Sequence, residues 1–186
     1  MNILITGCCG FIGYHLSQKI GTNHKVLGID NISTYYDTYY KYKRLKKLKS
    51  NKNFKFFKID ITDKKKIEKF FAKFNIDIVI NLAAQPGVRL SISNPSIYFQ
   101  NNIIGFFNLI ECVKKYRVIH FIFVSSSSVY GNQKKYPVQE DADVSKPLSF
   151  YGATKICNEA MAYSYSNMFK IPITCLRFFT VYGPEN

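Results

Sequence analysis

The stretch TGCCGFIG (residues 6–13) decides the fold of this chain. It follows a short apolar run, NILIT, and it opens a segment, FIGYHLSQKI, whose apolar residues recur at helical spacing. Its glycines have the spacing G-x-x-G-x-x-G and are Gly7, Gly10 and Gly13. Between a strand and a helix, such glycines permit a tight turn and let the backbone approach a pyrophosphate, which the N–H groups of the helix N-terminus can bind. The stretch therefore predicts a dinucleotide-binding loop.

The same alternation of short apolar runs and helical patterns continues along the chain. Strands are predicted at 2–6, 25–30, 54–60, 77–83, 120–126 and 172–179, and helices at 11–20, 40–49, 64–74, 95–116 and within 147–169. Apolar strands that alternate with helices form parallel sheets covered by helices. The predicted fold class is therefore α/β, a Rossmann-type doubly wound parallel sheet with helices on both faces, formed as one domain over residues 1–186.

Acidic residues follow two of these strands, at the edge where ligands bind in such sheets. Asp30 ends the second strand, 17 residues after Gly13. A carboxylate at this place accepts hydrogen bonds from the adenosine ribose and repels a 2′-phosphate, which favours NAD over NADP. The alternative for Asp30 is an ordinary strand-end turn residue. Asp60 follows the third strand, where it could reach the adenine edge or cap the next helix.

The cysteines indicate neither a disulfide framework nor a metal site. The chain has five, Cys8, Cys9, Cys112, Cys157 and Cys175, and none of them shows a metal-ligand spacing such as C-x-x-C. The adjacent pair in the glycine loop is interpreted as two small residues that fit a tight turn. The expectation is a reduced, cytoplasmic protein without a bound metal.

Charge and hydropathy limit the partners that we expect. The formal net charge is +14, carried largely by lysines in 41–58 and 63–74. We interpret these lysines as solvated helix faces and expect no nucleic-acid partner, although a basic field can attract an anionic substrate. The sequence has no run of 18 apolar residues and no signal-peptide pattern, so no membrane association is expected.

A tyrosine and a lysine lie one helical turn apart in SFYGATK (149–155). Tyr151 and Lys155 stand at positions i and i+4. The lysine ammonium is expected to favour the phenolate and lower the pKa of Tyr151, so that the tyrosine can act as a general base toward an alcohol. Such a pair alone is weak evidence. Here the glycine loop precedes the Tyr-Lys pair in the chain. Between the loop and the pair lies a strand whose end runs into four consecutive serines.

With these motifs the chain resembles the extended short-chain dehydrogenase/reductases, the family of NAD-dependent nucleotide-sugar epimerases and dehydratases. The matching segments occur in the family's order along nearly the whole chain: TGCCGFIG, GIDN, DITD, NLAAQ, SSSSVYG, YGATK and LRFFTVYGP. Within the family, the chain is most similar to the UDP-glucuronate 4-epimerases. That similarity lies in DNISTYYD, AAQPGVRLS, the serine run and RFFTVYGP.

The resemblance implies a role for each matching residue. The catalytic residues would be Ser126, Tyr151 and Lys155. The NAD cofactor would contact Gly7, Gly10, Phe11, Ile12, Gly13, Asp30, Asn31, Asp60, Ile61, Leu82, Ala83, Ala84, Tyr151 and Lys155. The nucleotide-sugar substrate would contact Gln85, Arg89, Ser126, Ser127, Ser128 and Thr180. For Arg89, a plain surface position is an equally good interpretation.

The serine run distinguishes between reactions of this family. Ser125 is expected only to end the strand. By resemblance, dehydratases and the decarboxylases that act on the same sugar acid carry acidic residues at one or both positions after the catalytic serine, whereas this chain has Ser127 and Ser128. The implied reaction is the conversion of UDP-glucuronate to UDP-galacturonate through a 4-keto sugar, with NAD regenerated in each cycle. Another epimerase, a dehydratase or a decarboxylase of the family stays open as an alternative.

The resemblance covers only part of a family member. Relatives continue well past the YGP motif (182–184), so the sugar-nucleotide-binding part is expected to be missing from this chain. One interpretation is a fragment or truncated product of a full epimerase, and another is a catalytically silent NAD-binding domain. The resemblance also allows a homodimer through 95–116 and 149–169, although these segments could simply pack on the sheet.

Overall fold

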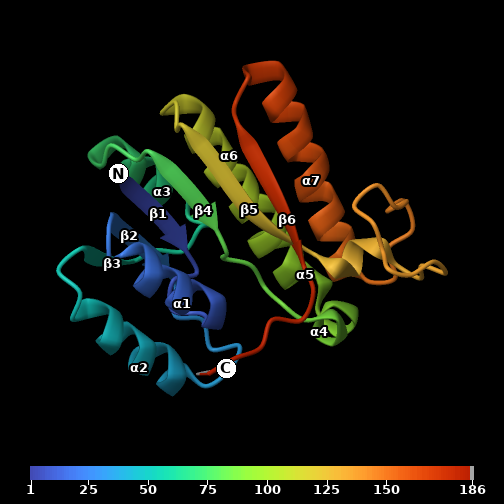
Figure 1. The fold of residues 1–186 in the computed structure, drawn as a ribbon, viewed down its shortest axis with the longest axis horizontal. Helices are drawn as coiled ribbons and strands as arrows, with labels where there is room; N and C mark the ends of the chain where they lie inside the picture. Colours follow the sequence, from blue (N-terminus) through green and yellow to red (C-terminus); the bar gives the residue numbers. More distant parts are fainter. Residues whose placement is uncertain (185–186) are drawn as a thin grey trace.

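The structure is a computed structural model, and it describes residues 1–184. A six-stranded, fully parallel sheet runs through the centre in the order β3-β2-β1-β4-β5-β6 (Figure 1). The strands are β1 Asn2–Thr6, β2 Lys25–Asp30, β3 Phe54–Lys58, β4 Ile78–Asn81, β5 His120–Ser126 and β6 Ile173–Phe178. This order, reversed between β1 and β4, is that of the Rossmann-type sheet, so the predicted fold class is confirmed.

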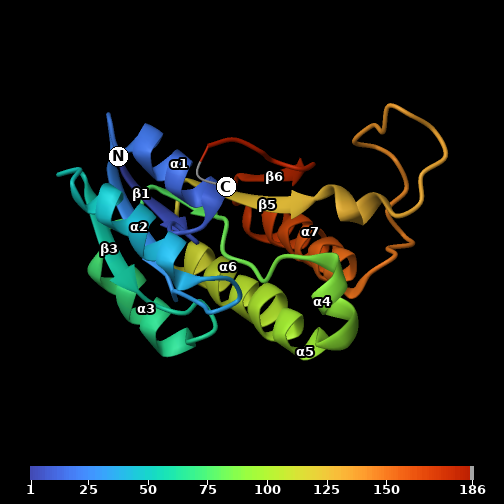
Figure 2. The ribbon, with the colours of Figure 1, turned by 90° about the horizontal axis from the view of Figure 1, so that it is seen from below.

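Helices cover both faces of the sheet, but not to the same extent. On one face lie α1 (Phe11–Ile20) and α2 (Thr38–Lys49), and on the other lie α3 (Lys64–Lys73), α6 (Gly105–Lys115) and α7 (Phe150–Phe169) (Figures 1 and 2). Two short helices, α4 (Val88–Ser93) and α5 (Pro95–Tyr98), lie beyond the carboxyl end of the sheet. Within residues 1–184, no helix has the length and apolar character needed to cross a membrane.

The segment 95–116 differs from the single regular helix that was predicted. After α5, a π-helical stretch, Phe99–Ile104, leads into α6. The short helix α4 before it was not predicted at all. A π segment adds one residue to a helical turn. The residues before and after the π segment keep their helical spacing of apolar side chains. The sequence pattern therefore predicted a helix there without showing the π turn.

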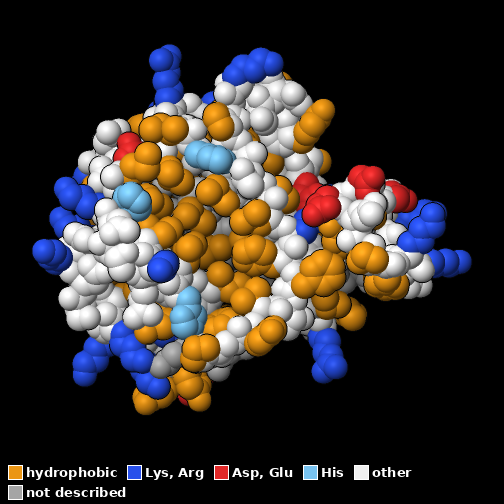
Figure 3. Space-filling view, viewed as in Figure 1, with side chains coloured by type: hydrophobic (Ala, Val, Ile, Leu, Met, Phe, Trp, Pro, Cys, Tyr) orange, Lys and Arg blue, Asp and Glu red, His pale blue; other side chains and the backbone are white. Residues whose placement is uncertain are grey.

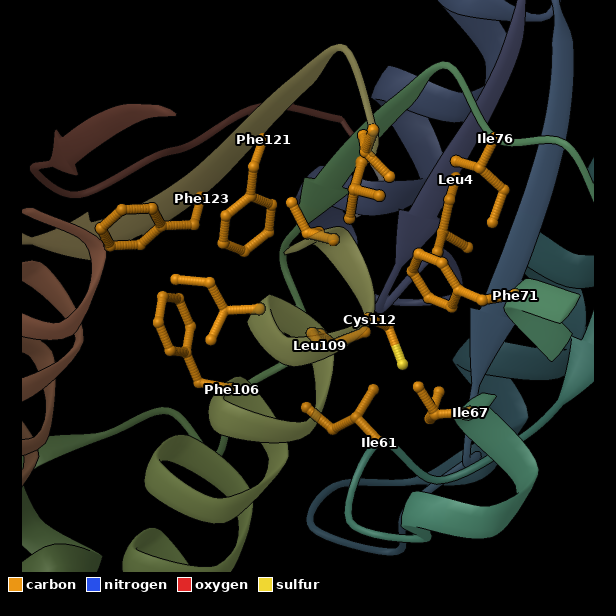
Figure 4. Close-up of a cluster of buried hydrophobic side chains, with 14 of the residues drawn as sticks. Leu4, Ile61, Ile67, Phe71, Ile76, Phe106, Leu109, Cys112, Phe121 and Phe123 are labelled. Carbon is orange, nitrogen blue, oxygen red and sulfur yellow. The ribbon is translucent and has the colours of Figure 1, made fainter. Parts of the chain in front are cut away.

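The larger part of the core lies between the sheet and α3, α6 and α7. Figure 4 shows this cluster, in which Phe106, Phe121 and Phe123 pack together while Leu4 and Phe71 meet on the β1 side. All five side chains are at most 2% exposed. Each such side chain stabilises the fold by roughly 1.5–3 kcal/mol through its removal from water. A second cluster lies between the sheet and α1 and α2.

On the face that carries α1, no helix of residues 1–184 covers β5 and β6. Along β5, Phe121 and Phe123 are buried, whereas the alternate residues Ile122 and Val124 are only partly buried. On β6, Leu176 is 37% exposed. Figure 3 shows an apolar surface in the middle of this face. Parallel strands are normally buried on both faces, so the predicted covering by helices holds over only part of the sheet.

The loop between β1 and α1 provides a test of the fold. A Cβ at Gly13 would lie 2.1 Å from the Gly7 carbonyl oxygen, whereas a Cβ at Gly10 would lie 3.2 Å from the same oxygen. Gly13→Ala must therefore push α1 away from the loop, and we expect it to lower the free energy of unfolding by about 1–3 kcal/mol. The matched variant Gly10→Ala should change it by less than about 0.5 kcal/mol. Urea denaturation of both variants measures this difference, and equal losses would contradict the packing described.

Candidate functional site

The glycine loop is fastened to the end of β2. The N–H groups of Gly7 and Cys8 donate to the Ile29 carbonyl at 2.7 and 3.3 Å, and the Gly10 N–H donates to the Gly7 carbonyl at 3.0 Å. Gly7 has φ +70°, and a Cβ there would lie 2.9 Å from the Ala83 nitrogen. Helix α1 begins directly afterwards with no side-chain cap and no acidic residue in its first turn. Its first N–H groups are therefore available to an anion.

A groove runs along the carboxyl edge of the sheet, over this loop. It consists of a cavity of about 310 Å³ near β2 and β3 and a cavity of about 280 Å³ near β5 and α7. The two cavities have Gly7, Gly10, Tyr36, Leu82 and Ala84 in common. The first also contains Asp30, Asn31, Asp60, Ile61 and Ala83, and the second contains Phe11, Ile12, Gly13, Tyr151 and Lys155. The fold thus brings every residue predicted for the cofactor to one groove.

Asp30 lies at the β2 end of the groove and is 6% exposed. One carboxylate oxygen accepts a hydrogen bond from the Cys9 N–H at 3.0 Å, and the other accepts one from the Ile32 N–H at 2.8 Å. The Lys41 ammonium lies 3.8 Å from the second oxygen. The carboxylate thus organises the turn after β2, which was the alternative considered for it. Since a carboxylate has about four acceptor sites, it can also accept further hydrogen bonds in the groove.

Asp60 stabilises the turn that follows β3. Its carboxylate accepts hydrogen bonds from the Asn31 side chain at 2.8 Å and from the Thr62 N–H at 2.8 Å. Burial raises the pKa of Asp60, but these hydrogen bonds from Asn31 and Thr62 outweigh that effect, so its pKa is lowered. The alternative of a helix cap is wrong for Asp60, because the residue that caps α3 is Asp63, which accepts from the Lys66 N–H.

Tyr151 and Lys155 lie at the other end of the groove. The Lys155 ammonium donates to the Val124 carbonyl at 2.8 Å and lies 5.8 Å from the centre of the Tyr151 ring. Burial lowers the pKa of Lys155 to about 8. Burial also raises the pKa of Tyr151, although a hydrogen bond with Ser126 opposes the rise. The predicted lowering of the Tyr151 pKa by Lys155 is therefore wrong for this structure, because desolvation of the phenol outweighs the other effects.

The four serines have different surroundings. Ser126 ends β5, where its hydroxyl accepts from the Ser128 N–H at 3.1 Å and donates to the Ser128 hydroxyl at 3.2 Å. Ser127 begins a 3-10 turn, Ser127–Tyr130. Ser125 does more than end the strand, because its hydroxyl donates to the Glu159 carboxylate at 2.5 Å. The same carboxylate receives two hydrogen bonds from Arg177, at 3.0 and 2.7 Å, so Ser125 helps to join α7 to β6.

The residues predicted for the substrate are only partly brought together. Gln85 lies in the first cavity and Ser126 in the second. Ser127 and Ser128 are partly buried beside the second cavity without lining it. Arg89, on α4, and Thr180, after β6, are exposed and line neither cavity.

Asn102 is a site residue that the sequence analysis missed. It lies in the π segment and is 1% exposed. Its side-chain oxygen accepts from the Gln85 N–H at 2.7 Å, and its amide nitrogen donates to the Gln85 carbonyl at 3.2 Å and to the Thr154 hydroxyl at 3.1 Å. Asn102 thereby holds the loop after β4 against α7. The sequence signal was the polar pair Asn101–Asn102 within an apolar helical pattern.

Comparisons with known proteins agree with this geometry. The sequence model of the family described as GDP-mannose 4,6 dehydratase matches residues 4–186. Protein CapI of Staphylococcus aureus is 46% identical over 99% of this chain, and a UDP-glucuronate 4-epimerase of Thermodesulfobacterium geofontis is 43% identical over 97%. This chain spans 55% and 56% of the length of these two relatives.

Solved structures show the same similarity. The crystal structure of UDP-glucuronic acid 4-epimerase from Bacillus cereus, in complex with UDP-glucuronic acid and NAD, superposes with a TM-score of 0.91 at 40% identity. It matches 100% of this chain, which covers 58% of that protein's chain. A UDP-glucose 4-epimerase from Thermotoga maritima with UDP-glucose has a TM-score of 0.88 at 34% identity, again over 100% of this chain and 57% of the other.

The Asn102 contacts give a prediction about stability. Asn102→Leu leaves the buried N–H and carbonyl of Gln85 without these partners, and we expect it to lower the free energy of unfolding by at least about 2 kcal/mol. Asn101→Leu is the matched control, because Asn101 only donates to the Ile97 carbonyl one turn earlier, in a partly buried position. Urea denaturation of the two variants measures the difference. Equal effects would mean that Asn102 does not anchor the loop.

The pKa of Lys155 gives a prediction about pH dependence. Since burial lowers this pKa from 10.5 to about 8, the unfolded chain binds more protons than the folded chain between these pH values. Stability therefore rises with pH in this window. Relative to Lys155→Met, the native protein should gain about 3 kcal/mol in the free energy of unfolding from pH 8 to 10.5. The control variant Lys65→Met, at an exposed site, should show the same rise in the free energy of unfolding as the native protein. An equal rise in Lys155→Met would contradict the prediction.

Proposed function

Because the chain belongs to the GDP-mannose 4,6 dehydratase family of extended short-chain dehydrogenase/reductases, we propose that it forms the NAD-binding and catalytic portion of a nucleotide-sugar 4-epimerase that acts on UDP-glucuronate. One observation carries this proposal. The groove holds the glycine loop and Asp30 at one end and Ser126, Tyr151 and Lys155 at the other. A dinucleotide and a reacting alcohol can therefore share one site.

The residues of the groove fit NAD. Gly7 and Gly10 line both cavities, and the uncapped N-terminus of α1 beside them can hold a pyrophosphate. Asp30 can accept hydrogen bonds from ribose hydroxyls, and its negative charge disfavours a 2′-phosphate. When bound, NAD supplies reversible hydride acceptance at the sugar carbon.

The residues of this chain would provide the proton path. Ser126 and Tyr151 line the same cavity, and Ser126 acts to lower the pKa of Tyr151, so the two hydroxyls can pass a proton from the sugar 4-hydroxyl and return it. With a pKa of about 8, Lys155 is mostly protonated at pH 7 and can stabilise the phenolate when Tyr151 takes up its role as base. The raised pKa of Tyr151 makes this assistance necessary.

The choice of reaction rests on the serines after Ser126. Ser127 and Ser128 are hydroxyls, and no carboxylate stands at either position to serve a further elimination or decarboxylation step. Hydroxyls can donate hydrogen bonds to the carboxylate of a sugar acid. The net charge of +14 favours the approach of such an anionic substrate. This combination supports epimerisation of UDP-glucuronate to UDP-galacturonate over the other reactions of the family.

The proposal includes a sugar-nucleotide-binding part outside residues 1–186. The apolar surface over β5 and β6 supports it, because parallel strands are normally covered on both faces. The relatives are also longer than this chain, which spans 55% of Protein CapI. A silent NAD-binding domain stays the second candidate. A cytoplasmic location and a homodimer through α6 and α7 stay predictions.

Incubation with NAD and UDP-glucuronate tests the proposal, using a protein in which this chain is joined to the sugar-nucleotide-binding part that the proposal includes. We expect UDP-galacturonate, and we expect Tyr151→Phe to reduce turnover by at least about 100-fold while leaving NAD affinity nearly unchanged. Tyr163→Phe, on the exposed side of α7, is the matched control and should keep full activity. Pentose and carbon dioxide as products would contradict the argument from the serines. NAD binding without any turnover would favour the silent domain.

A further inference from the structure

Two thiols and a carboxylate meet behind the glycine loop. Cys8 and Cys9 are both 0% exposed, and their sulfur atoms lie 3.8 Å apart. The Asp30 carboxylate reaches them from the end of β2, and one ligand atom from each of the three residues lies within 4.8 Å of the others. Within residues 1–184, this is the one group of three or more such side chains close enough to share an ion.

The spacing of the two sulfur atoms matches tetrahedral coordination. Zinc bonds of about 2.3 Å to sulfur place two thiolate ligands about 3.8 Å apart. That is the separation that the Cys8 and Cys9 sulfur atoms already have. Bonds of about 2.0–2.2 Å to a carboxylate oxygen place it about 3.6 Å from each sulfur. The Asp30 ligand atom lies within 4.8 Å of both sulfur atoms, so it has to move toward them by up to about 1.2 Å to bind the same ion.

We propose that Cys8, Cys9 and Asp30 form a binding site for a thiophilic divalent cation of the zinc class. Two thiolates and one carboxylate are a donor set that such ions prefer. The sequence spacing alone gives no sign of the site, because the third ligand comes from a different strand.

The charges around the site are compatible with such an ion. Three anionic ligands exceed the charge of a divalent ion by one. The Lys41 ammonium lies 3.8 Å from Asp30, and the Arg44 guanidinium donates to the Cys9 carbonyl at 3.3 Å. These two cations offset the remaining negative charge. Since both thiols must lose their protons, the affinity for the ion rises with pH.

The site would couple the ion to the cofactor groove, and this consequence rests on the proposed function. Asp30 is the residue proposed to accept the ribose hydroxyls of NAD, and the loop that carries both thiols is the one proposed to hold its pyrophosphate. An ion that engages Asp30 should therefore weaken NAD binding. By thermodynamic reciprocity, NAD should weaken ion binding by the same factor.

Cobalt(II) is the probe for the ion site itself, because thiolate ligands give it a charge-transfer absorption. The full chain, reduced with a phosphine and free of NAD, is titrated with cobalt(II). We expect one ion per chain, an absorption typical of two thiolates in a tetrahedral site, and displacement by zinc. Cys8→Ala/Cys9→Ala should abolish the absorption, whereas the matched control Cys112→Ala/Cys175→Ala should keep it. No thiolate absorption, or an absorption that the first variant retains, would overturn the proposal.

A second measurement does not depend on that variant being able to fold. Because Cys8 and Cys9 are 0% exposed, alkylation should reach them only slowly, through local opening of the loop. Mass spectrometry over time should show that cobalt(II) slows their alkylation further and leaves that of Cys157 unchanged. Protection of any other pair would overturn the proposal. Asp30→Asn keeps both thiols and should lower cobalt affinity by about 10-fold or more. An affinity equal to that of the native chain would remove Asp30 from the site.

Titration of cobalt(II) at saturating NAD tests the coupling. We expect the cobalt affinity to fall, and an unchanged affinity with NAD demonstrably bound would overturn the coupling. Failure of the chain to bind NAD would count against the proposed function. The cobalt absorption measured without NAD would still decide the ion site.

Discussion

The β1–α1 loop is held against the end of β2 by main-chain hydrogen bonds, and the groove depends on this attachment. The Gly7 and Cys8 N–H groups reach the Ile29 carbonyl, and the Asp30 carboxylate accepts from the Cys9 N–H. These contacts direct the N-terminus of α1 toward the open edge of the sheet. They also explain the glycine at position 13, because α1 passes so close to the loop that a Cβ would collide with the Gly7 carbonyl. The conformation of the β1–α1 loop is therefore set both by these hydrogen bonds and by the close packing of α1 at Gly13.

The opposite end of the groove depends on side chains that join distant elements. Asn102 binds the loop after β4 and the Thr154 hydroxyl on α7, and Glu159 connects α7 to Ser125 on β5 and to Arg177 on β6. In a buried setting such bonds are costly to lose, because each unpaired partner stays desolvated. Tyr151 and Lys155 are therefore placed by a framework of residues that join α7 to β5, β6 and the loop after β4.

Burial has a cost at this end of the groove. It raises the pKa of Tyr151 and lowers that of Lys155, so both charged forms needed for base catalysis are disfavoured in the structure. The prediction from sequence considered only the attraction between a phenolate and an ammonium. It had the wrong direction for Tyr151 because desolvation depends on the surrounding elements, which the spacing of two residues in a helix does not report.

The sequence by itself determined the α/β class, the six strands, the glycine loop and the set of predicted cofactor residues that meet in the groove, because these depend on local periodicity and on the rule that strand ends meet at one edge. Only the tertiary structure decided the π segment that buries Asn102, the role of Ser125, the exposed positions of Arg89 and Thr180, and the bare sheet face over β5 and β6. It also brought Asp30 to the thiols of Cys8 and Cys9, which the sequence had shown only as small loop residues. Each of these features depends on how segments far apart in the chain are placed relative to one another. That placement does not change the spacing of apolar residues within a segment, so the sequence pattern does not report it.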